Sequence, residues 1–130
     1  MVSGAASIHI PLERDPSSAF HGRTAVHELI CDVASPSFVR DATLATSELV
    51  TNAFMHTPGD LELRAQFDGA RGWLRVEVSD SSSEPPRPGP APEPGQVGGL
   101  GLLIVAALTS TWGTTPNERG KTVWFELVDR

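Results

Sequence analysis

Three residues able to do chemistry follow one another at intervals of four in the middle of the chain: Glu48, Asn52 and His56. An α-helix turns about 100° per residue, so each step of four moves a side chain by only about 40° around the axis. A helix here would therefore hold an acid, an amide and an imidazole in one narrow stripe, with groups able to bind a metal ion and move protons. A line of apolar residues marks the neighbouring face of the same helix: Ala45, Leu49 and Ala53. We interpret the segment as the wall of an active site.

The length and the cysteine content favour one intracellular domain. A chain of 130 residues can bury a core of its own, and we find no internal repeat, so we expect a single domain over residues 1–130. The single cysteine, Cys31, can form no internal disulfide, which fits a reducing cytoplasm. Because Cys31 lies in an apolar helical stretch, we expect a buried structural thiol rather than a reactive one.

The charge excludes one broad class of function. The formal net charge is −6 with ten Lys and Arg residues, which argues against direct nucleic-acid binding because such binding relies on a basic face. The same charge permits partners with basic surfaces.

The chain has no signal-peptide pattern at residues 1–7 and no apolar run of the ~18 residues that a membrane span needs, so a cytoplasmic protein is expected.

The first half of the chain reads as a strand and two helices. Residues 7–12 alternate between polar and apolar types, and Pro11 suits a strand at the edge of a sheet. Asp15-Pro16 is a helix-start signal, and apolar residues at helical spacing continue it to near Ala34. Ser35-Pro36 repeats the signal and begins the helix with the polar stripe, which should end at about His56.

A period of two then replaces the helical period. Residues 61–67 and 73–79 predict two strands joined by a turn at residues 68–72, and the second strand runs directly into Asp80. An acid at the end of a strand is well placed to bind a ligand.

Residues 81–97 contain six prolines and almost no apolar side chains, so they can form neither a helix nor an inner strand. We weigh a flap over a ligand against a disordered loop. Gly98-Gly99-Leu100-Gly101 then leads into an apolar helix over residues 102–108, which we expect to be buried. Glycines at a helix start let backbone amides approach an anion. Strands over residues 111–115 and 121–128 close the chain.

The predicted fold is an α+β two-layer sandwich. It has a mixed, mostly antiparallel sheet of about five strands, with about three helices on one face, in the order β-α-α-β-β-flap-α-β-β.

This ordered set resembles the histidine-kinase-like ATPase superfamily, whose members share the Bergerat ATP-binding fold. In detail it looks most like the anti-sigma-factor serine/threonine kinase branch in its actinobacterial form. The resemblance covers nearly the whole chain, and its motifs are specific only as a set: Ser47-Glu48-Leu49-Val50-Thr51-Asn52-Ala53 with His56, Val76-Glu77-Val78-Ser79-Asp80, Gly99-Leu100-Gly101-Leu102, Trp112-Gly113 and Gly120-Lys121-Thr122-Val123-Trp124-Phe125.

The resemblance implies a role for each matching residue. Asn52 would bind Mg²⁺ that bridges the ATP phosphates, and Glu48 would be the general base. Asp80 would accept a hydrogen bond from the exocyclic amine of adenine. Gly99-Leu100-Gly101-Leu102 would contact the nucleotide, the glycine amides meeting the phosphates. Thr122 would lie beside the adenine.

Other positions receive less direct roles from the same resemblance. Residues 81–97 would be the ATP lid. Lys121 would either reach the phosphates or end its strand in solvent, and we favour solvent. His56 is not expected to be a phosphoacceptor, because that histidine normally belongs to a separate dimerisation helix. It is expected to pack at the helix end, near the nucleotide. His21, Arg23 and His27 lie on the first helix, which often contacts partners in this family; a solvated surface is the alternative there.

Two functions follow. The first is an ATP-binding anti-sigma-like regulator that phosphorylates a serine or threonine of an antagonist and acts by partner switching, with a sigma factor and a STAS-type anti-anti-sigma protein as partners and a homodimer as a possible assembly. The second is a non-catalytic or nucleotide-independent partner-binding member of the same fold. The second is favoured by the Ser81-Ser82-Ser83 run after Asp80, where the family often has Asp-x-Gly-x-Gly, since glycines let a backbone approach a base. A third interpretation is the catalytic domain of a sensor kinase, separated from its other domains. The missing phosphoacceptor helix argues against it.

Overall fold

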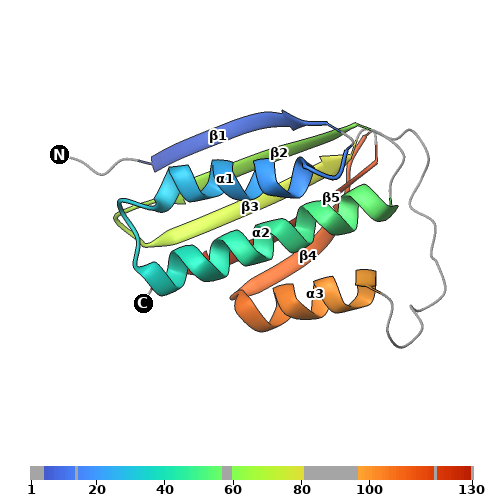
Figure 1. Cartoon of the computed structure of the whole chain (residues 1–130). Helices are drawn as coiled ribbons and strands as arrows, with labels where there is room; N and C mark the ends of the chain where they lie inside the picture. Colours follow the sequence, from blue (N-terminus) through green and yellow to red (C-terminus); the bar gives the residue numbers. More distant parts are fainter. Residues whose placement is uncertain (1–4, 14, 57–59, 81–96, 119, 130) are drawn as a thin grey trace.

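The protein is a two-layer α+β sandwich in which three helices cover one face of an open sheet (Figure 1). The computed structural model describes residues 5–13, 15–56, 60–80, 97–118 and 120–129. The elements follow in this order: β1 (Ala5–Leu12), α1 (Ser18–Ile30), α2 (Pro36–His56), β2 (Leu61–Asp68), β3 (Trp73–Asp80), α3 (Val97–Leu108), β4 (Thr111–Pro116) and β5 (Lys121–Val128). The predicted fold class is confirmed.

The sheet has the strand order β1-β2-β3-β5-β4. Each of its four neighbouring pairs is antiparallel, so the described sheet contains none of the parallel pairing that a mixed sheet would have. Pro11 lies in β1 and Pro116 in β4, which are the two edge strands, where the missing N–H of a proline costs no ladder hydrogen bond.

The core lies between the sheet and the helices. Strict alternation in β2, β3 and β5 sends every second side chain towards the helix layer. These strand residues are buried there: Leu61, Leu63, Ala65, Phe67, Leu74, Val76, Val78, Val123, Phe125 and Leu127. The helices contribute the opposing residues: Val26, Ile30, Phe38, Ala42, Ala45, Leu49, Val50, Ala53 and Val105.

The start of α2 is tied to the end of the chain. The backbone amide and the hydroxyl of Ser35 donate to the carboxylate of Asp129, at 3.0 and 2.7 Å. The Ser35 hydroxyl oxygen also accepts from the amide of Phe38 at 3.3 Å, which satisfies one free amide of the first turn. Asp129 in turn donates its amide to the carbonyl of Gly72. The predicted start of this helix is therefore confirmed, together with a support that the sequence did not reveal.

The end of α1 and the place of Cys31 differ from the predictions. The helix ends at Ile30, four residues before the expected end near Ala34. Cys31 caps the helix and is exposed, so the expected buried thiol is wrong. The buried stripe of the helix contains Val26 and Ile30, and one residue further the side chain turns away from it and the chain leaves the helix. Val33 is 63% exposed for the same reason.

The expected burial of α3 is also wrong for its described side chains. Among residues 103–108 only Val105 is buried, while Leu103 is 66% exposed. The helix lies at the outer side of the helix layer beside α2 (Figure 1), so one of its faces packs and another faces solvent. A helix with apolar residues on all sides gives no pattern from which the packed side can be predicted.

Candidate functional site

Glu48 and Asn52 lie on the flank of α2 that faces away from α1. The other flank is fixed by Gly22 of α1, where an added Cβ would be 3.0 Å from Cγ2 of Val50 and 3.8 Å from Cγ2 of Thr46. Glu48 and Asn52 are each two residues from Val50, which places them about 160° around the helix from it. Since α2 lies between α1 and α3, both side chains are on its α3 side (Figure 1).

Their surroundings differ in burial. Glu48 and Asn52 are one helical turn apart on the same flank. Asn52 is only 8% exposed, whereas Glu48 is half-buried. A buried amide beside a more accessible carboxylate can hold a ligand atom in place while the carboxylate exchanges a proton with an incoming group.

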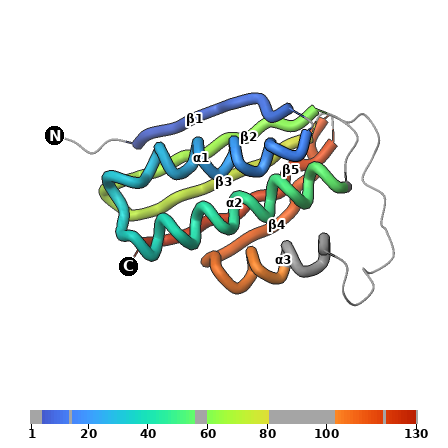
Figure 2. Tube along the Cα trace, viewed as in Figure 1, coloured from blue at the N-terminus to red at the C-terminus, as the bar shows by residue number. Residues whose placement is uncertain are grey.

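Asp80 is the last residue of β3, and its side chain lies on the face of the sheet that the helices cover. It continues the series of Leu74, Val76 and Val78, whose side chains face the helices, and it is 6% exposed. It pairs with Leu61, the first residue of β2, which follows α2 closely in the chain. Asp80 and the last turns of α2 therefore lie at the same end of the molecule (Figure 2).

The start of α3 lies at this end as well. The helix leads into β4, whose first residue Thr111 pairs with Glu126 near the end of β5, so the helix runs from the Asp80 end of the sheet towards the opposite end (Figure 1). Gly98 and Gly99 lie in the first turn, where backbone amides have no acceptor within the helix. Gly101 lies in the second turn. The side chains of Leu100 and Leu102 are outside the described part of the helix, as are residues 81–96 of the expected lid and the side chain of His56.

Thr122 lies on the face of the sheet that the helices do not cover, where it lines a hollow together with Asp80. Its hydroxyl is 2.8 Å from the hydroxyl of Ser79 and accepts from Nδ2 of Asn117 at 3.1 Å. Ser79 and Thr122 are paired residues on the uncovered face of the sheet, next to the Val78–Val123 pair that faces the helices. Lys121 is the residue of β5 that shares the face of Asp80 and Val123. The alternation of side chains along β5 is the sequence signal that puts Lys121 and Thr122 on opposite faces of the sheet.

The uncovered face carries a polar surface of its own. Two hollows of about 460 and 470 Å³ open on it, and they share His9, Arg64 and Glu77. Asp80, Asn117, Glu118 and Thr122 also line the second hollow.

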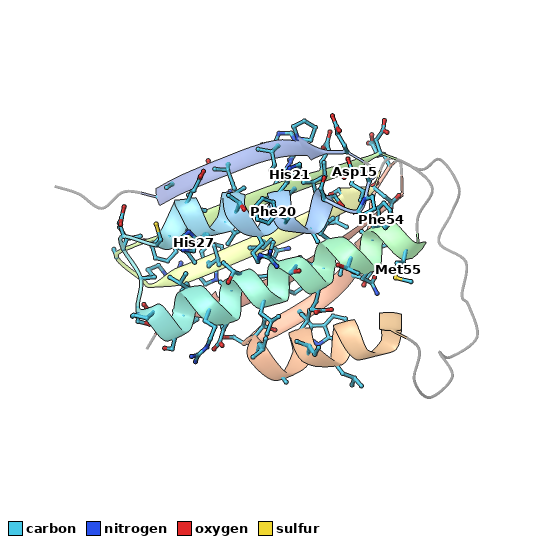
Figure 3. All side chains as sticks on the ribbon, viewed as in Figure 1. Asp15, Phe20, His21, His27, Phe54 and Met55 are labelled. Carbon is cyan, nitrogen blue, oxygen red and sulfur yellow. The ribbon has the colours of Figure 1, made fainter. Side chains whose placement is uncertain are left out.

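The exposed side of α1 carries mixed aromatic and basic side chains. Phe20 is 56% exposed, with the Arg23 guanidinium 5.5 Å from its ring centre and the His21 ring at 6.0 Å. Figure 3 shows Phe20, His21 and His27 along this helix. At its start, the hydroxyl and the amide of Ser17 donate to the carboxylate of Asp15, which lowers the pKa of Asp15, and the nearby His21 adds to the effect.

No three His, Cys, Asp or Glu side chains in the described residues are grouped so that they could hold a metal ion by themselves. No helix in the described ranges has the length and apolar character needed to cross a bilayer.

Comparison with known proteins identifies the class. Residues 15–127 match the family described as histidine kinase-like ATPase domain, so the chain belongs to that family. The predicted superfamily is thereby confirmed, and ATP is the ligand for which the family is named.

A solved structure shares the fold. It contains the RsbU and RsbW domains of Rv1364c from Mycobacterium tuberculosis, and it is similar over 96% of this chain and 33% of that chain, with a TM-score of 0.72 and 23% sequence identity. The chain thus spans about a third of the length of that protein. No curated protein matches the sequence.

Proposed function

We propose that the chain binds Mg²⁺-ATP at the end of the molecule where α2, α3 and β3 meet, and that it passes the terminal phosphate to a serine or threonine of an antagonist protein. The observation that supports this most is the burial of two polar side chains, Asn52 and Asp80, at the edge of an apolar core. Burying a polar group costs free energy unless it is hydrogen-bonded, and ligand sites typically place a few such groups among apolar side chains.

Each residue has one task in this proposal. Asp80 accepts a hydrogen bond from the 6-amine of adenine, and Asn52 offers its side-chain oxygen to Mg²⁺, an ion that usually takes few protein ligands and several phosphate oxygens. Gly99, in the first turn of α3, offers its amide to a phosphate. Glu48, half-buried one turn before Asn52, accepts the proton of the attacking hydroxyl as its oxygen bonds to the terminal phosphorus and ADP leaves.

The regulatory part of the proposal is partner switching. A protein of charge −6 that phosphorylates its antagonist adds roughly two negative charges to it, and like-charge repulsion then releases the product. The likeness in fold to a structure with an RsbW domain supports this kind of function. We propose a sigma factor and a STAS-type antagonist as partners of a single-domain chain, with the exposed Phe20 and Arg23 of α1 among the contacts and a homodimer as the assembly.

A second candidate is a member that binds partners without transferring phosphate. The run Ser81-Ser82-Ser83 after Asp80 favours it, because these residues stand where glycines would let the backbone approach the base.

Two measurements test these proposals in order. Calorimetric titration with ATP, with and without Mg²⁺, should show binding that Mg²⁺ strengthens; no binding at millimolar ATP would overturn both nucleotide-dependent versions. Incubation with the candidate antagonist and labelled ATP should then transfer phosphate. Glu48→Gln should stop the transfer while ATP binding persists, and Glu62→Gln, a matched change on the uncovered face, should leave both intact. Transfer that survives Glu48→Gln would remove Glu48 as the base.

A further inference from the structure

Lys121 and Thr122 are neighbours in the chain whose side chains lie on opposite faces of the sheet. The 2.8 Å contact between the hydroxyls of Thr122 and Ser79 fixes Thr122 on the uncovered face. The register of β3 and β5 pairs Ser79 with Thr122 and Val78 with Val123. Carried one residue further, the same register sets Lys121 opposite Asp80, and the alternation of side chains sets both on the helix-covered face.

The surroundings of Lys121 agree with this placement. The hollow on the uncovered face is lined by Asn117, Glu118 and Thr122 and is reached by Asp80 at the end of β3, while Lys121 is not part of its lining. Its side chain is half-buried, and the next inward residue of that face, Val123, is 4% exposed. In the part of the chain that the structure describes, Lys121 forms no ion pair.

We propose that the Lys121 ammonium donates a hydrogen bond to N1 of the adenine base, so that Asp80 and Lys121 together recognise the base edge. The inference rests on the proposed function, in which Asp80 accepts from the 6-amine. Cross-strand neighbours on one face have Cβ atoms about 4.5–5.5 Å apart, so two such side chains can reach adjacent atoms of one ring.

The pair matches adenine and opposes guanine. Adenine carries a donor, the 6-amine, next to an acceptor, N1; guanine carries an acceptor, O6, next to a donor, the N1–H. A carboxylate alone discriminates poorly, because it can also accept from the N1–H of guanine. An ammonium beside it leaves that N–H facing a second donor, and an unmatched polar pair in a desolvated site is the usual source of strong discrimination. Lys121 is therefore a specificity-determining residue in this proposal.

The test uses ATP and 1-deaza-ATP, in which a C–H replaces N1 and the 6-amine remains. The wild-type chain should bind 1-deaza-ATP about tenfold to a hundredfold more weakly than ATP, the range expected for a hydrogen bond to a charged group. Lys121→Met should lose the same factor for ATP and nothing more for the analogue, because the variant and the analogue remove the same contact. Lys121→Gln, which keeps an N–H donor, should retain part of the preference for ATP.

The control is Glu126→Gln, on the same strand and on the uncovered face, which should leave the ratio of the two affinities unchanged. Equal binding of both nucleotides by the wild-type chain would overturn the inference and leave the proposed function standing. Equal weakening of both nucleotides by Lys121→Met would also overturn it, because the lysine would then act on the phosphates. Absence of ATP binding by the wild-type chain would overturn the proposed function and the inference with it.

Discussion

The two faces of the sheet are built from the same strands and carry different kinds of side chain. The helix-covered face is apolar up to the end of β3, where Asp80 follows Val78. The uncovered face carries side chains joined in polar pairs: His9–Glu62, Arg75–Glu77, Arg75–Glu126 and Ser79–Thr122. Because a strand alternates its side chains, one residue of sequence decides which face a group serves. Adjacent residues of this chain can therefore differ completely in their access to the candidate site.

The largest difference between the faces should appear in stability. Phe125 is fully buried on the helix-covered face, so Phe125→Ala should lower the free energy of unfolding by about 3–5 kcal/mol, measured by urea denaturation. Glu126→Ala, at the next residue and on the other face, removes a partner of Arg75 that is partly solvated and should cost about 1 kcal/mol or less. Similar losses for the two variants would contradict the division into faces.

The contact between α1 and α2 should be sensitive to added volume. A Cβ on Gly22 would lie 3.0 Å from Cγ2 of Val50 and 3.3 Å from Cδ1 of Leu63, so Gly22→Val should cost about 1–3 kcal/mol by overpacking. The nearest atom to a Cβ on Gly69 is 3.7 Å away, which is ordinary contact. Gly69→Ala is the matched control and should change the unfolding midpoint little. Tolerance of the Gly22→Val change would mean that the two helices are less closely packed than described.

On the uncovered face, Trp124 should respond to a change at Gly113. A Cβ on Gly113 would lie 2.8 Å from Cζ2 of Trp124, so Gly113→Ala must displace the indole from its place under the Arg75 guanidinium, now 4.3 Å from the ring centre. We expect a loss of about 1 kcal/mol and a shift in tryptophan fluorescence. The loss should shrink in the double variant with Trp124→Leu, because the two residues are in contact. Additive losses would show that the indole is not the obstacle.

The start of α1 gives the smallest expected effect. Hydrogen bonds from Ser17 lower the pKa of Asp15 from its ordinary value of 3.8, so the ionised form is favoured in the folded chain. The contribution is therefore present above the unfolded pKa and is lost as the pH falls through the lower folded pKa. Asp15→Ala should reduce the melting temperature slightly at pH 7, and the difference should vanish near pH 2. A difference that persisted there would exclude this carboxylate as its source.

Much of this fold could be predicted because local and global patterns agree. The Ser35-Pro36 signal marks the start of α2, and the alternation in β2, β3 and β5 gives both their extents and their buried sides. Glu48 and Asn52 could be assigned to one flank from their spacing alone. The exposure of Leu103 could not be predicted, since an apolar helix carries no pattern of sides, and neither could that of Cys31, which depends on where α1 ends. The alternation of the last strand already separates Lys121 from Thr122, while the cross-strand position of Lys121 opposite Asp80 depends on the register of two strands that are distant in sequence.

The most direct test of the account is an ATP titration of three chains: wild type, Asp80→Asn and Thr122→Val, each in Mg²⁺ and each checked for the same thermal unfolding. Because the proposed nucleotide site lies on the helix-covered face, Asp80→Asn should weaken ATP binding by about tenfold or more, and Thr122→Val should leave it within about twofold. Binding that is lost in Thr122→Val and kept in Asp80→Asn would place the nucleotide on the uncovered face and contradict the account.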